Sequence, residues 1–522
     1  MKGSMEFSIL DFRFSIWEWV LNRRAFLRSR LFALCVAGLP WIACAQSSEI
    51  PKRPEELKFP PLVYAPPKAA DYRVALKSGP VAYVVPDKSL PLVNIVVYVR
   101  TGKYLEPAGR EGLAELTGHL LTHGGTKNLA AEPFEERVAF LAADLDSSIA
   151  DTQGSVSLNL LSKDLDEGLK LLREVLTEPR FQDDKIALYK QQKLQEMQQR
   201  NDDSEAIEAR EAAFLAYGAK FWINDHATSN SVVSIFRDDL AAFHRKWFAP
   251  ENFVVAANGD FDRDAMAGKL EALFANWPFP GEKPPPIPTD ASFAPPGVYI
   301  VNKDLNQGRV SMMLPGIRRD NPDYFNVLVM NDILGGGDFS SRITKSVRSD
   351  EGLAYSAYSI FPGGVYYPLV FTAAFQSKSR TVTYAASIVL KQMKSMIEGE
   401  PTDQEMNISK RGFIDRLPQT FSTRTKVANV LAQDEFTGRY ARDPDFWQKY
   451  PARIEAVTKA DVERVAKKFI TPEKTVILIV GQKSDISMKL PEHPVTIQEL
   501  TTGRVVDVPM RDPMTMLPMP LP

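Results

Sequence analysis

One segment of this sequence is repeated in the second half of the chain. Residues 239–259 align with residues 461–481 at a shift of 222 positions, without a gap. Both copies read as a helix, a Pro-Glu turn, a strand and a final glycine, and six of the 21 aligned pairs are identical. A period this long excludes a solenoid of short repeats, whose units have about 20–50 residues. We therefore expect two related domains in tandem.

A proline-rich segment lies between the two copies. Residues 278–296 contain eight prolines, and proline fixes φ and lacks the N–H group that helices and sheets need. We interpret this segment as a stiff linker. It separates a first domain at residues 72–277 from a second domain at residues 297–485. The remaining residues, 486–522, form a tail without a motif that we can interpret.

Hydrophobic periodicity predicts that both helices and strands build these domains, which makes the fold class α+β. Leu165, Leu169 and Leu172 lie on one stripe of a helix. Residues 155–160 instead alternate polar and apolar side chains, as a half-buried strand does. In the first domain, strands are predicted at residues 81–85, 93–99, 155–160 and 253–257, and helices at residues 112–123, 132–143, 164–178, 237–248 and 262–275. A further long polar helix, which carries Glu196, is predicted after the one at residues 164–178.

Residues 1–45 have the features of an export signal. Asn22–Arg28 resembles the twin-arginine motif, an apolar run follows at residues 31–42, and Ala43–Ala45 fits an A-x-A cleavage site. Twelve apolar residues are too few to span a bilayer, which needs about twenty. We therefore expect a periplasmic or secreted protein with no membrane span in the mature chain, and a proline-rich extended arm at residues 46–71. A retained anchor, a lipid anchor and the general secretory route are alternatives.

Charge and composition argue against other classes of protein. The formal net charge is −2, with acidic and basic residues interspersed, whereas nucleic-acid-binding proteins concentrate basic residues on one face. The chain is 44% hydrophobic and 25% charged, which is ordinary for a globular protein. We expect no nucleic-acid partner.

The predicted helix at residues 112–123 carries the first candidate functional residues. Glu115 and His119 are four positions apart, as are His119 and His123, so each pair lies on one helical face. Two histidines at this spacing can bind zinc, and a glutamate on the same helix can act as general base. A solvated or capped histidine pair is the alternative, because His123 lies at the helix end.

The segment Gly112–Thr126 resembles the start of the zinc motif in the pitrilysin/insulinase family of metallopeptidases. When the inverted H-x-x-E-H motif of that family is aligned with this segment, its first histidine corresponds to Glu115, its catalytic glutamate to Gly118 and its second histidine to His119. The third family ligand, a glutamate, falls on Glu196, 77 residues past His119. The resemblance implies a vestigial metal site without a general base, a group that contributes about 10²–10⁴ in rate. We expect no cofactor in this chain.

The strongest resemblance to this family lies in the second domain. Residues 334–358 resemble the family segment L-G-G-G-x-x-S-R-L-x-x-x-x-R-x-x-x-G-L-A-Y-S. The arginine and tyrosine that contact the substrate in the family match Arg348 and Tyr355. A guanidinium and a phenol can hydrogen-bond a peptide carbonyl and stabilise the charge that builds on it. Alternatively, Arg348 pairs with a nearby carboxylate, Asp350 or Glu351, and the tyrosine packs in a sheet.

The resemblance covers roughly residues 72–482 and implies a fold and a function. Family members consist of homologous tandem α+β domains, the insulinase/mitochondrial-processing-peptidase-like metallohydrolase fold, which enclose a cavity. Some divide the work between a zinc-bearing chain and a chain with the Arg/Tyr pair. The resemblance implies that this chain is the second kind, a non-catalytic, substrate-binding subunit of a heterodimeric zinc metallopeptidase, with zinc in its partner. An extended peptide substrate would bind by strand addition.

Two alternatives remain open. The first is an autonomous zinc peptidase with a rearranged site of Glu115, His119 and Glu196, because three protein ligands suffice for a catalytic zinc. The second is a peptide-binding or scaffold protein with no proteolytic role. The sequence identifies neither the peptide nor the partner.

Overall fold

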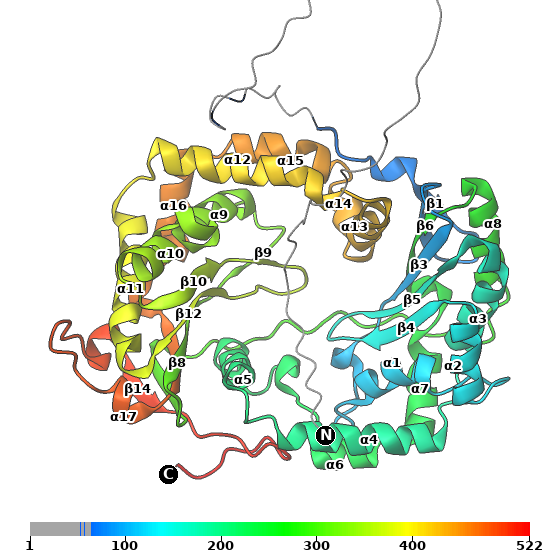
Figure 1. The fold of residues 1–522 in the computed structure, drawn as a ribbon, viewed down its shortest axis with the longest axis horizontal. Helices are drawn as coiled ribbons and strands as arrows, with labels where there is room; N and C mark the ends of the chain where they lie inside the picture. Colours follow the sequence, from blue (N-terminus) through cyan, green and yellow to red (C-terminus); the bar gives the residue numbers. More distant parts are fainter. Residues whose placement is uncertain (1–52, 54–56, 58–63, 522) are drawn as a thin grey trace, which may run out of the picture. The chain divides into compact units, whose positions relative to one another are not determined.

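The computed structural model describes residues 53, 57 and 64–521 (Figure 1). The predicted export signal at residues 1–45 lies outside the described residues, as does most of the proline-rich arm at residues 46–71. Within residues 64–521, no helix is long and apolar enough to cross a membrane.

The first sheet has six strands in the order β1-β2-β6-β3-β5-β4. β2 and β6 run parallel, and all other neighbours are antiparallel. In β4 and β5 every second residue is buried, which is the pattern of a sheet with one covered face. The strands are β1 (Arg73–Ala75), β2 (Val81–Pro86), β3 (Leu92–Val99), β4 (Asp144–Ile149), β5 (Gly154–Leu161) and β6 (Phe253–Gly259).

Helices cover the buried face of the first sheet. Leu172, on the predicted apolar stripe, and Leu116, on the predicted helix at residues 112–123, share one core with Val97 and Leu158 of the sheet. The predicted helices and strands of this domain are confirmed to within a few residues, whereas the strands β1 and β4 and the helices at residues 204–217 and 229–234 were not predicted. The helices are α1 (Leu113–His123), α2 (Ala131–Phe140), α3 (Leu165–Thr177), α4 (Asp183–Gln198), α5 (Ser204–Tyr217), α6 (Ser229–Ser234), α7 (Arg237–Trp247) and α8 (Arg263–Phe274).

The second sheet has the order β10-β12-β8-β13-β7-β14 and repeats five strands of the first, β2-β6-β3-β5-β4, as β7-β13-β8-β12-β10. Its sixth strand differs, because β14 pairs parallel with β7 whereas β1 pairs antiparallel with β2. β13 pairs parallel with β7 and antiparallel with β8, as β6 does with β2 and β3. The expected pair of related α+β domains is therefore present. The strands are β7 (Gly297–Asn302), β8 (Gln307–Leu314), β10 (Ala354–Ile360), β12 (Phe371–Lys378), β13 (Val476–Gly481) and β14 (Arg504–Asp507), and β9 (Ile317–Arg318) and β11 (Gly363–Gly364) form a separate small sheet.

Helices also cover one face of the second sheet, where Val329, Val389 and Val465 share a core with Val310 and Ile479. The segment after α10 continues in a helical conformation over Lys345–Asp350. The helices are α9 (Tyr324–Asn331), α10 (Arg342–Thr344), α11 (Val382–Glu398), α12 (Asp403–Thr420), α13 (Arg424–Phe436), α14 (Arg439–Arg442), α15 (Phe446–Glu455), α16 (Lys459–Phe469) and α17 (Lys483–Ile486).

One helix from each half packs on the sheet of the other half (Figure 1). α5 lies against β8 and β13, where Ile207 shares a core with Leu478. α13 lies against β2 and β6, where Leu431 shares a core with Val254. Each helix covers only part of its sheet. On the second sheet, the side chains of β10, β12 and the neighbouring part of β8 therefore line an open cavity beside α5.

The tail at residues 486–522, for which the sequence offered no interpretation, contributes to the second domain. β14 pairs with β7 at the edge of the second sheet. Beyond it, Arg511 forms an ion pair with Glu211 of α5 at 3.1 Å. The backbone N–H of Ser229 donates a hydrogen bond of 2.8 Å to the carbonyl of Met514. The tail thus connects the second sheet to helices of the first half.

Candidate functional site

The helix with the predicted metal-binding positions, α1, is held firmly against the first sheet. It begins after Gly112, which has a positive φ of 100°, and it ends at His123 before Gly124. Leu113, Leu116 and Leu120 are buried. The opposite face of α1 therefore carries Glu115 and His119, as the spacing predicted.

Gly118, at the position of the family's catalytic glutamate, lies directly against the backbone of β4. A Cβ atom at this position would be 2.4 Å from the nitrogen of Ile149 and 2.8 Å from the carbonyl carbon of Ser148. The hydroxyl of Ser147 donates a hydrogen bond of 2.6 Å to the Gly118 carbonyl. No side chain fits at position 118 unless α1 or β4 moves.

A lysine ammonium lies between the two vestigial carboxylates. Lys193 Nζ is 2.8 Å from Glu115 Oε1 and 3.2 Å from Glu196 Oε2, and the lysine side chain is only 12% exposed. A zinc site needs its carboxylates free to ligate a cation. Here an ammonium of the same chain supplies the positive charge between them.

The remaining vestigial ligand, His119, is packed between aromatic rings. Its imidazole stacks on His123 with centroids 4.4 Å apart and contacts Tyr189 at 4.9 Å. Burial, with a smaller contribution from His123, lowers the pKa of His119. In the described part of the chain, no group of three His, Cys, Asp or Glu side chains has an arrangement that could hold a metal ion. The residues at the predicted site therefore do not fit a zinc ion.

The predicted substrate-contact residues of the second half lie at the edge strand β10. β10 is the outermost strand and pairs with β12 with an irregularity between Ala354 and Ala357. Tyr355 is 87% exposed, and Tyr358 and Ile360 are also exposed. An edge strand has unpaired N–H and C=O groups, so an extended peptide can add to it.

Arg348 lies in the helical segment that precedes β10 and stacks on aromatic rings. Its guanidinium carbon is 4.4 Å from the ring centre of Phe339 and 4.8 Å from that of Tyr355. Among the ion pairs formed by the described residues, Arg348 has no carboxylate partner. The alternative in which Arg348 pairs with Asp350 or Glu351 and the tyrosine packs in the sheet is not what the structure contains.

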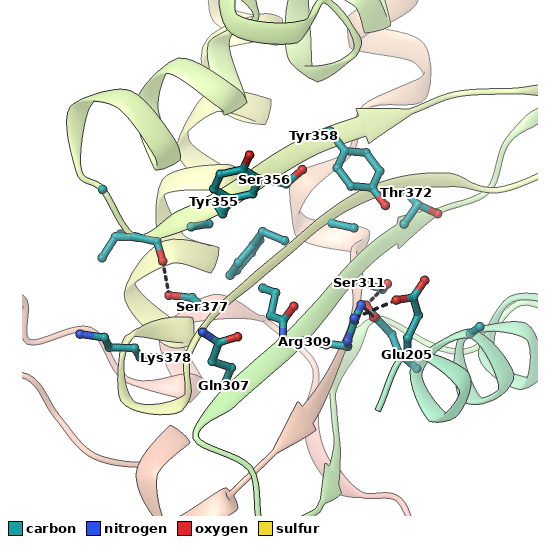
Figure 2. Close-up of a pocket in the computed structure, with 18 residues that line it drawn as sticks. Glu205, Gln307, Arg309, Ser311, Tyr355, Ser356, Tyr358, Thr372, Ser377 and Lys378 are labelled. Atoms are coloured by element: carbon teal, nitrogen blue, oxygen red, sulfur yellow. Dashed lines mark hydrogen bonds and ion pairs between the residues drawn. The ribbon is translucent and has the colours of Figure 1, made fainter. Parts of the chain in front are cut away.

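Two cavities flank β10. One has a volume of about 480 Å³ and is lined by Tyr355, Tyr358 and Arg309, and Figure 2 shows these side chains with Glu205 on α5 at the far side. The other has a volume of about 490 Å³ and is lined by Arg348 and by residues of β10. The arginine and the tyrosine thus open onto adjacent cavities.

The first of these cavities contains a charged group that sequence reasoning missed. Burial raises the pKa of Glu208, which accepts a hydrogen bond of 2.6 Å from the Ser311 hydroxyl and lies 3.5 Å from Arg309. Glu205 forms a second ion pair with Arg309 at 2.8 Å. No motif signals these glutamates, because they reach the cavity only through the packing of α5 on the other half's sheet.

Models of one peptidase family match both halves of the chain. The model described as insulinase, peptidase family M16, matches residues 83–220. The model described as peptidase M16 inactive domain matches residues 234–413. Together they match well over half of the sequence.

Individual proteins give the same result. A Helicobacter pylori protein named non-peptidase homolog YmxG is 29% identical over 64% of this chain and 78% of its own length. An uncharacterized zinc protease of Mycobacterium tuberculosis is 29% identical over 52% of this chain and 63% of its own length. A crystal structure described as a peptidase M16 inactive domain from Pseudomonas fluorescens superposes with a TM-score of 0.70 at 23% identity, covering 79% of this chain and 97% of that one.

Proposed function

Since the chain belongs to peptidase family M16, the insulinase family, we propose that it is a non-catalytic member that binds extended peptides and acts with a zinc-bearing homologous chain. The observation that carries this proposal is the contact of Gly118 with β4. A hydrolytic water needs a positioned base, and the backbone of Ile149 and Ser148 fills the space in which a carboxylate at position 118 would lie.

The ion pairs of Lys193 support the same proposal. An ammonium held by Glu115 and Glu196 removes both carboxylates from metal binding. We therefore assign the zinc of the active complex to the partner chain. In this chain, Arg348 and Tyr355 take the role of substrate contacts, with their guanidinium and phenol groups available to a peptide carbonyl.

The edge strand β10 supports binding of an extended peptide. Main-chain hydrogen bonds to an added strand give affinity with little side-chain selectivity. The exposed side chains of Tyr355, Tyr358 and Ile360 lie along the same edge. Because of the predicted export signal at residues 1–45, we place this activity outside the cytoplasm.

Purification from the native source tests the partnership. We expect a homologous chain with an H-x-x-E-H motif to co-purify with the full-length protein, and only the complex to contain zinc and cleave peptides. Chelator-sensitive cleavage by the rigorously purified single chain would contradict the proposal and favour the rearranged site. Peptide binding without cleavage in any complex would instead favour a scaffold role.

Substitutions test the assignment of the substrate contacts. In the complex, Arg348→Ala is expected to lower kcat/KM about 10²-fold, the effect of losing one donor to a developing charge. Tyr355→Phe should lower it in the same direction, because only the hydroxyl is removed. Arg380→Ala, at an exposed arginine of the same domain, is the matched control and should leave the rate unchanged. Equal rates for all three variants would remove Arg348 and Tyr355 from the site.

A further inference from the structure

A third cavity, which shares no lining residue with the two beside β10, has a strongly basic lining. Its volume is about 430 Å³, and residues of the first half, the linker and the second half all line it. Its walls come from the loops after β3, β4 and β11, the linker, β9, the end of α13, and α14. Every lining side chain that is charged at neutral pH is a cation: Arg100, Lys283, Arg318 and Arg442.

Most of this charge is not neutralised within the protein. Among the ion pairs of the described residues, only Arg318 has a carboxylate partner, Asp320. Arg100 and Arg442 donate to backbone carbonyls at the C-terminal end of α13, those of Phe436 and Thr437. A helix C-terminus provides only about half a negative charge, so the cavity keeps a net positive charge of several units.

A neighbouring arginine adds to the positive potential. Arg319 follows Arg318 in the chain and donates to the Thr437 carbonyl at 2.7 Å. Its Nε is buried and has no hydrogen-bond partner within the part of the chain that the structure describes. Burial, with the nearby Arg439 and Arg442, lowers the pKa of Arg319 to about 10. Like charges held this close raise the free energy of the empty cavity, and an anion would relieve that repulsion.

We propose that this cavity binds an acidic segment of the peptide ligand, with carboxylates paired to Lys283, Arg442 and Arg100. The proposal deepens the proposed function and rests on it for the ligand being a peptide.

Size and lining favour a peptide over a single inorganic anion. A volume of about 430 Å³ is in the range of sites for organic ligands, roughly 300–1,000 Å³. The cations come from separate chain segments, so they suit two or more carboxylates carried on one backbone. Tyr104, Tyr366 and Pro285 supply apolar wall between the cations, against which the aliphatic part of a peptide can pack.

A binding experiment on the full-length chain tests this assignment. The probes are a fluorescent peptide with a cluster of glutamates and the same peptide with glutamines, and binding is measured by anisotropy at low and physiological salt. We expect the glutamate peptide to bind about tenfold more tightly, since hydrogen bonds between charged groups are the stronger ones. The preference should shrink as salt is raised.

Matched variants locate the preference. The double variant Lys283→Gln/Arg442→Gln should bind both peptides equally. The control Lys170→Gln/Lys394→Gln removes the same charge from two exposed helical lysines and should keep the tenfold preference. A preference that survives in the cavity variant would overturn the proposal.

Other outcomes separate this inference from the proposed function. Binding of both peptides by the unmodified chain without preference would overturn the inference alone. Failure to bind either peptide would overturn the proposed function as well. Tight binding of inorganic phosphate that is lost in the cavity variant, with no preference between the peptides, would assign the cavity to a free anion and overturn the peptide assignment.

Discussion

The contact between Gly118 and β4 predicts the effect of a single methyl group. In Gly118→Ala the new Cβ would lie 2.4 Å from the Ile149 nitrogen, and overpacking of this kind costs about 1–3 kcal/mol. We take about 3 kcal/mol, because backbone atoms of a paired strand cannot rotate away. Alanine is favoured over glycine in a helix by about 1 kcal/mol. The expected net loss of stability is therefore about 2 kcal/mol.

The control for this prediction is Gly268→Ala in the helix α8. Apart from the backbone of α8 itself, no described atom lies within 4 Å of a Cβ placed at Gly268, so only the helix propensity acts, and stability should rise by up to about 1 kcal/mol. The two substitutions are chemically identical and should shift stability in opposite directions.

Denaturant unfolding and local hydrogen exchange measure the effect. Since a two-domain protein need not unfold in one step, exchange of peptides from α1 and β4 is the decisive readout. A loss of about 2 kcal/mol corresponds to local exchange about 30-fold faster. If Gly118→Ala is as stable as Gly268→Ala, then α1 and β4 are not in close contact, position 118 has room for a carboxylate, and the main argument against a base at this position fails.

Further predictions concern Glu106 and the tail. Burial raises the pKa of Glu106 to about 7 in the folded chain. Between about pH 4.5 and pH 7, the folded state therefore keeps a proton that the unfolded state releases. The free energy of unfolding should fall by up to about 3 kcal/mol as the pH rises through this range. Unfolding curves at both ends of this range should show the fall in the unmodified chain and its loss in Glu106→Gln. Equal pH dependence in the two proteins would contradict a raised pKa of Glu106. Arg511→Ala removes one partner of Glu211, which is only 1% exposed, and among the described residues leaves it the ion pair with Arg210. The expected loss of stability is about 1.5–3 kcal/mol, the contribution of a hydrogen bond to a charged group. The control Lys483→Ala breaks the more exposed ion pair between Lys483 and Asp507 of the tail. It should cost less than about 1 kcal/mol in the same denaturation assay. Similar losses in both variants would show that the tail is not anchored through Glu211.

Local patterns determined much of the fold because their signals lie within a few residues. The stripe of Leu165, Leu169 and Leu172 became α3, and the alternation at residues 155–160 became β5. The 222-residue repeat indicated two related domains, and the two sheets share the order of five of their six strands. β4 was missed because Ser147, one of its three buried positions, is polar. The strand therefore lacks a clear alternation of polar and apolar side chains.

The resemblance also singled out Glu115, Gly118, His119 and Glu196 as positions of a predicted vestigial zinc site. It could show that position 118 lacks a carboxylate, because that depends only on residue identity. It could not show that β4 closes this position or that Lys193 joins the two glutamates, because both depend on contacts between α1 and elements more than 25 residues away in the chain.

Three features were decided by the tertiary structure alone. The tail joined the second sheet as β14. The helices α5 and α13 each packed on the sheet of the opposite half. Cations from four chain segments came together at the linker. Each of these depends on which surfaces meet after the chain has folded, whereas hydrophobic periodicity reports only which face of an element is apolar. The sequence by itself therefore determined the elements, the duplication and the missing base, and the packing of the two halves decided what surrounds them.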